Sequence, residues 1–61
     1  MEIASRACYN LAVACEMTGN FTDAIFWAQQ SYDKKEKPRT RYYILQLKNR
    51  KIELEKINKQ L

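Results

Sequence analysis

Small and apolar residues recur every three or four positions in two stretches of the chain, on either side of Gly19. The first stretch carries Ala4, Cys8, Leu11, Ala12 and Cys15, and the second carries Phe21, Ala24, Ile25, Ala28 and Tyr32. Spacings of three and four place side chains on one face of an α-helix. The pattern therefore predicts two amphipathic helices, the first from about Ile3 to Thr18 and the second from about Phe21 to Lys34.

Gly19 and Asn20 separate the two predicted helices. Glycine adopts the left-handed backbone conformation that often follows a helix, and an asparagine side chain can accept a hydrogen bond from the first turn of the next helix. Asp23 places a negative charge near the positive end of that helix. We therefore expect a tight turn that makes the two helices antiparallel.

Alanines on the facing sides of these helices predict a close approach. Ala12, Ala24 and Ala28 have small side chains that let the two helix backbones lie near each other. Three larger residues are expected to fill the space beside them: Leu11, Phe21 and Ile25. A hairpin of this kind cannot bury all of its apolar surface, so we expect it to pack on neighbours.

A third helix is predicted after a polar link, Lys35-Glu36-Lys37. Pro38 suits the first position of a helix, which could run from there nearly to Leu61. The predicted fold is all-α, with an antiparallel helical hairpin in residues 1–34 and a long capping or extension helix in residues 35–61. Together they form one small domain. A chain of this length buries only about 60% of its unfolded surface, so association or membership of a longer protein is expected.

The predicted third helix carries two apolar stripes. We expect the first stripe to pack on the second helix through Tyr42, Leu45 and Ile52. The other stripe consists of Tyr43, Leu47, Leu54, Ile57 and Leu61, which recur at spacings of three, four and seven. Two interpretations remain open for it: apolar residues scattered along a solvated helix, or a seam for self-association or for docking on another domain.

Charge divides the chain into two parts. Residues 1–33 hold one arginine against four acidic residues, a net charge of −3, whereas residues 34–61 hold ten basic against three acidic residues, a net charge of +7. Basic residues surround the third helix, which is typical of a solvated surface and gives nucleic acid no single cationic face. An alternative is that the acidic hairpin of one copy meets the basic helix of another.

The composition offers little for catalysis or metal binding. The chain has no histidine, and its two cysteines, Cys8 and Cys15, lie seven positions apart on the predicted core face of one helix. That separation is about 10.5 Å along an intact helix, which is too long for a disulfide. We therefore expect buried free thiols, no metal site, no cofactor and no enzymatic activity.

Residues 8–33, CYNLAVACEMTGNFTDAIFWAQQSYD, resemble a tetratricopeptide repeat. Six residues fall at the spacing of that family's pattern of large and small residues: Cys8, Leu11, Ala12, Cys15, Ala24 and Ala28. The chain departs from the pattern where cysteines replace the family's tryptophan and tyrosine and where the customary proline is displaced to Pro38. The resemblance covers about half of the chain. It implies a repeat hairpin followed by a capping helix, as in the last repeat of a longer bacterial protein.

The resemblance implies a protein-binding module in which the first helix lines a groove. Transferred to this sequence, the partner-binding positions are Arg6, Tyr9, Asn10, Val13, Glu16 and Met17. Arg6 and Asn10 are similar to part of the clamp by which some members of the family hold a terminal carboxylate. Phe26 and Trp27 form a further candidate interface.

Three functions are therefore considered for the chain. The first is a non-catalytic scaffold or adaptor that binds a protein or peptide. The second is a structural module that forms homo-oligomers through the C-terminal helix, and the third and least favoured is a basic nucleic-acid-binding module. No stretch is apolar enough for a predicted membrane span, and the compartment is left open.

Overall fold

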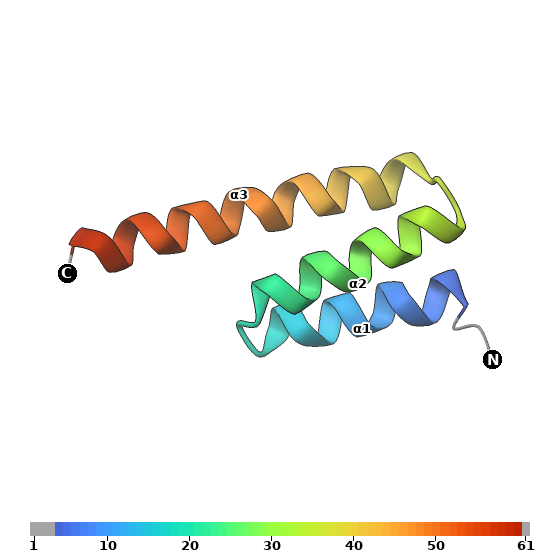
Figure 1. The fold of residues 1–61 in the computed structure, drawn as a ribbon, viewed down its shortest axis with the longest axis horizontal. Coiled ribbons are helices and arrows are strands. Elements are labelled where there is room, and N and C mark those ends of the chain that lie inside the picture. Colours follow the sequence, from blue (N-terminus) through green and yellow to red (C-terminus); the bar gives the residue numbers. More distant parts are fainter. Residues whose placement is uncertain (1–3, 61) are drawn as a thin grey trace.

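The computed structural model describes residues 4–60, with side chains described for residues 4–57. Three helices follow one another: α1 (Ser5–Met17), α2 (Phe21–Lys34) and α3 (Pro38–Gln60). Figure 1 shows α1 and α2 as an antiparallel pair, with α3 lying along the other side of α2. The described part of the chain contains no strand. The predicted all-α hairpin followed by a long third helix is therefore confirmed.

The α1–α2 turn forms as its residues predict. Gly19 has a φ of +81°, and its N–H donates to the carbonyl of Glu16 over 3.0 Å. The Asn20 side chain accepts from the backbone N–H of Asp23 over 3.2 Å and donates to the Asp23 carboxylate over 2.7 Å. The start of α2 is therefore capped, whereas Ala4 provides no side-chain cap to α1.

Alanines pack at the centre of the bundle. Ala12, Ala24 and Ala28 are each 0% exposed, so the predicted close approach of α1 and α2 is confirmed. Phe21 and Ile25 are half-buried beside them, as expected. Leu11, in contrast, is 38% exposed. Because the two helices lie close together, only small side chains fit at the centre. The larger Leu11 side chain lies at the edge of the helix pair.

The prediction of which stripe of α3 faces the hairpin was wrong. Leu47 is 0% exposed and Tyr43 is half-buried, whereas Tyr42, Leu45 and Ile52 are 63%, 52% and 49% exposed. The two stripes have similar apolar content, so the pattern alone did not choose between them. The buried face also includes Thr40 and Ile44, one turn apart.

The face of α3 that packs on the hairpin is exposed to solvent where the helix extends past the hairpin. With about 1.5 Å of rise per residue, α3 is about 35 Å long and α2 only about 21 Å long. Figure 1 shows the C-terminal part of α3 projecting past the turn between α1 and α2. Leu54 and Ile57 lie on this projection and are 43% and 54% exposed. Of the predicted seam, therefore, Tyr43 and Leu47 belong to the core, Leu54 and Ile57 are exposed, and Leu61 lies outside the described residues.

Leucines on the two faces of α3 provide a direct test of this arrangement. Leu47→Ala is expected to lower the free energy of unfolding by about 2–5 kcal/mol, because it leaves a cavity in the core. Leu45→Ala, on the exposed face, is expected to change it by less than about 0.5 kcal/mol. Urea denaturation, monitored by circular dichroism, measures both changes. Equal losses of stability would contradict the finding that Leu47, and not Leu45, faces the hairpin.

Candidate binding site

Side chains of α1 and α3, together with Phe21 at the start of α2, form a continuous row of six that we call the α1–α3 ladder. In order along the row, its members are Arg39, Tyr9, Tyr43, Glu16, Arg50 and Phe21. The Arg39 guanidinium lies 5.5 Å from the centre of the Tyr9 ring, and the Tyr9 and Tyr43 rings are 5.1 Å apart at a tilt of 41°. Cation–π and tilted aromatic pairs of this kind are attractive. The aromatic half of the ladder therefore holds the start of α3 against the middle of α1.

Glu16 connects the two halves of the ladder. Tyr43 Oη donates to Glu16 Oε1 over 2.8 Å, and Arg50 Nη1 donates to Glu16 Oε2 over 2.7 Å. Arg50 also lies 5.9 Å from the centre of the Phe21 ring. The Arg50 side chain is 61% exposed, so solvent screens its ion pair with Glu16. The hydrogen bond from the half-buried Tyr43 is less exposed to solvent than this ion pair.

The environment of Tyr43 changes its ionisation. Burial raises the pKa of Tyr43 well above its ordinary value of about 10, and the hydrogen bond to Glu16 and the negative charge of that carboxylate raise it further. The neutral phenol is the form that donates to Glu16. Deprotonation would place two negative charges side by side in a partly buried position.

Of the six predicted partner-binding residues, two are largely engaged within the domain. Tyr9 and Glu16 are half-buried members of the ladder. The other four, Arg6, Asn10, Val13 and Met17, lie on the part of α1 next to the ladder; Val13 is half-buried, and Met17 is 82% exposed. The structure therefore leaves Arg6, Asn10 and Met17 accessible to a partner and uses Tyr9 and Glu16 to hold α3.

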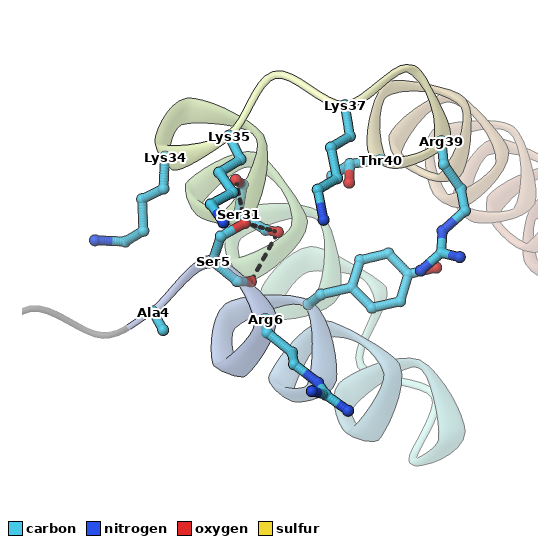
Figure 2. A pocket seen from close by; sticks show the side chains of 10 residues that line it. Ala4, Ser5, Arg6, Ser31, Lys34, Lys35, Lys37, Arg39 and Thr40 are labelled. Atoms are coloured by element: carbon cyan, nitrogen blue, oxygen red, sulfur yellow. Dashed lines mark hydrogen bonds between the residues drawn. The ribbon is translucent and has the colours of Figure 1, made fainter.

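A basic pocket lies at the end of the bundle where the α2–α3 link passes the start of α1. Its volume is about 690 Å³, and we call it the basic pocket. Ten residues line it: Ala4, Ser5, Arg6, Tyr9, Ser31, Lys34, Lys35, Lys37, Arg39 and Thr40. Five of them are cationic and none is acidic. Figure 2 shows Lys37 extending from the link toward α1, with Arg39 reaching in from the first turn of α3.

A reciprocal pair of serines forms the floor of the basic pocket. Ser5 Oγ donates to the carbonyl of Ser31, and Ser31 Oγ donates to the carbonyl of Ser5, both over 2.9 Å. These bonds are drawn in Figure 2. Ser31 is 2% exposed, so its hydroxyl is satisfied by α1 and not by water. The two bonds fix the start of α1 to the end of α2 and keep the pocket floor polar.

Sequence reasoning missed the basic pocket. Lys34, Lys35, Lys37 and Arg39 place four cations within six positions, but Lys35 and Lys37 were assigned to a polar link and the other two to the flanking helices. Ser31 continues the spacing of Ala24 and Ala28, which was a signal that it too would be buried. Arg6 was identified as a candidate, but its predicted clamp partner, Asn10, does not line the pocket.

Other candidates have ordinary structural roles. Trp27 is half-buried and packs against the core, with its ring edge-to-face on Phe26 at 5.2 Å. Phe26 is 53% exposed. Cys8 is buried, Cys15 is half-buried, and both thiols are free. Within residues 4–57 no group of three potential ligands gathers as a metal site would require, and no described helix is long and apolar enough to cross a membrane.

Comparison with known proteins defines the family of the chain but not its activity. Residues 1–49 match the family model described as a domain of unknown function (DUF6340). Because the match covers well over half of the chain, this protein belongs to the DUF6340 family. No curated protein and no solved structure matches it.

The raised pKa of Tyr43 predicts a loss of stability at high pH. Tyrosine in an unfolded chain has a pKa near 10, so the stabilisation from this group is complete below about pH 10 and is lost as the pH rises toward the higher pKa of the folded state. Urea unfolding between about pH 8 and about pH 12 should therefore show a steeper decline for the wild type than for Tyr43→Phe. Identical slopes would show that Tyr43 does not titrate abnormally.

Proposed function

We propose that this domain is a non-catalytic, tetratricopeptide-type module that binds a segment of a protein partner on the face formed by α1 and α3. The proposal rests on the number of positions that separate contacting residues of α1 and α3 in the sequence. Glu16 and Arg50 form an ion pair and are 34 positions apart, and the contacting rings of Tyr9 and Tyr43 have the same separation. A tetratricopeptide repeat is about 34 residues long, so this separation supports α3 as the counterpart of α1 in a following repeat.

Packing and exposure support the same proposal. The helix pair is held together by small residues, which is how helices of a repeat approach closely. Next to the ladder, the exposed residues offer different contacts: Arg6 a cationic fork, Asn10 an amide and Met17 an adaptable apolar side chain. Because the ladder fixes α1 relative to α3, a partner would meet a surface that is already ordered, which reduces the entropic cost of binding.

A second candidate function is homo-oligomerisation through the C-terminal part of α3. Leu54 and Ile57 favour it, because both are exposed on the part of α3 that projects past the hairpin (Figure 1). The many cations of α3 oppose a direct pairing of two α3 helices. Sedimentation equilibrium at micromolar concentration distinguishes the two functions: a folded monomer would eliminate this second candidate.

Peptide selection tests the leading proposal. Peptides selected from a random display library are expected to bind the α1–α3 face. Met17→Ala and Arg6→Gln should each weaken binding by about 1 kcal/mol or more, which is the size expected of an anchoring contact. The matched control is Leu45→Ala, which removes an exposed apolar side chain on roughly the opposite side of α3 from Tyr43. It should leave binding unchanged.

Isothermal titration calorimetry measures these affinities, and circular dichroism confirms that each variant is folded. If Leu45→Ala weakens binding as much as Met17→Ala does, the α1–α3 face is not the binding surface. If selection yields no peptide that binds the folded domain, the proposal fails.

A further inference from the structure

We infer that the basic pocket is a binding site for a compact polyphosphate, a small molecule that carries two or more linked phosphoryl groups. This site goes beyond the proposed protein-binding function: the two share Arg6, whereas Lys34, Lys35, Lys37 and Arg39 belong to the pocket alone. The starting point is the composition of its lining: five cationic side chains, three hydroxyl-bearing aliphatic residues, one tyrosine, one alanine and no carboxylate.

Among the described residues, no acidic side chain lines the pocket or forms an ion pair with its five cations. The ion pair found in the described part of the chain joins Arg50 to Glu16, away from the pocket. Asp33, the acidic residue closest in sequence to Lys34, accepts a hydrogen bond from Gln29 and does not line the pocket. Glu36 is exposed and is also absent from the lining. The positive potential inside the pocket is therefore not neutralised by the described residues, and an anion would enter favourably.

The five cations that line the pocket come from different elements. Arg6 comes from α1, Lys34 from the end of α2, Lys35 and Lys37 from the link, and Arg39 from α3. Figure 2 shows Lys35 and Lys37 extending toward the start of α1 and Arg39 approaching from α3, whereas Lys34 and Arg6 point away from these three. Phosphoryl groups have several acceptor oxygens that can be approached from several sides, and both lysine and arginine bind them strongly. An arrangement of this kind suits a compact polyanion better than a single carboxylate.

Size and charge indicate more than one phosphoryl group. The volume of about 690 Å³ is within the range of about 300–1,000 Å³ that is typical of small-molecule sites. A single phosphate carries at most two negative charges near neutral pH and leaves most of the cations without a counterion. A chain of two or three phosphoryl groups can contact Lys37 and Arg39 on one side and Lys35 on the other.

The attraction of the pocket for anions comes from its charged side chains and not from helix dipoles. The C-terminal end of α2 and the N-terminal end of α3 both border the pocket, and their dipoles have opposite signs there. The hydroxyl protons of Ser5 and Ser31 are already donated to backbone carbonyls, so these serines shape the floor and do not compete for the ligand. The lysines and arginines provide the available donors.

Titration calorimetry with inorganic tripolyphosphate tests the site on the full chain. We expect one ligand per chain, an affinity that decreases as salt is raised, and weaker binding of orthophosphate and sulfate at equal ionic strength. The double variant Lys35→Gln/Lys37→Gln should weaken tripolyphosphate binding at least about tenfold, since it removes two charges from the pocket. Both side chains are exposed, so the variant should remain folded.

The matched control is Lys48→Gln/Lys56→Gln, which removes the same net charge from exposed positions of α3 that do not line the pocket. This variant should bind within about twofold of the wild type. Equal weakening by the two double variants would mean non-specific attraction to a basic protein and would overturn the inference. Tighter binding of a tetraglutamate peptide than of tripolyphosphate, lost in Lys35→Gln/Lys37→Gln, would overturn the phosphate assignment.

NMR spectroscopy of the labelled chain gives an independent readout. Tripolyphosphate should shift the backbone amide signals of Ser5, Ser31 and Lys37, which surround the pocket, and leave those of Leu45 and Ile52 unchanged. Shifts spread evenly along α3 would contradict a single site. Because Met17→Ala does not alter the pocket, it should retain full tripolyphosphate binding even if it abolishes peptide binding.

Discussion

The close approach of α2 to its two neighbours is the constraint on which the rest of this structure depends. Ala24 and Ala28 on α2 and Ala12 on α1 are completely buried, so the helix backbones come near each other without large side chains between them. The large residues Phe21, Ile25 and Trp27 are consequently only partly buried at the edges. A small domain gains little from area alone, and close packing of backbone on backbone provides the dispersion contacts that its limited core cannot.

This packing also decides where the charges lie. α3 carries most of the positive charge, and among its cations with described side chains Arg50 alone forms an ion pair with the acidic hairpin, through Glu16. At the other end of the bundle, the short α2–α3 link brings Lys35, Lys37 and Arg39 next to the start of α1. Among the described residues, the same geometry therefore produces a neutralised contact between Glu16 and Arg50 and a basic pocket that no acidic residue lines.

The two proposed sites are connected through the ladder. Arg39 lines the basic pocket and also packs on Tyr9, which contacts Tyr43 and thereby Glu16. An anion that draws Arg39 toward the pocket would compete with its contact on Tyr9. The part of the chain that matches the DUF6340 family, residues 1–49, includes the entire pocket and most of the ladder. The exposed projection with Leu54 and Ile57 lies after it.

Local patterns in the sequence determined the helices and the turn, because spacing, Gly19, the Asn20 cap and Pro38 act within a few residues of themselves. They also determined that Ala12, Ala24 and Ala28 would be buried, since these alanines lie on the same helix faces as the larger apolar residues. Which face of α3 packs on the hairpin was decided only by tertiary structure, because the two apolar stripes of α3 are similar in composition. The short α2–α3 link and the packing of Ile44 and Leu47 on the hairpin selected the buried stripe. The basic pocket likewise needs α1, the link and α3 together. Four of its cations lie within six positions of the chain, but no local pattern reveals that folding brings the start of α1, with Arg6 and Ser5, next to them.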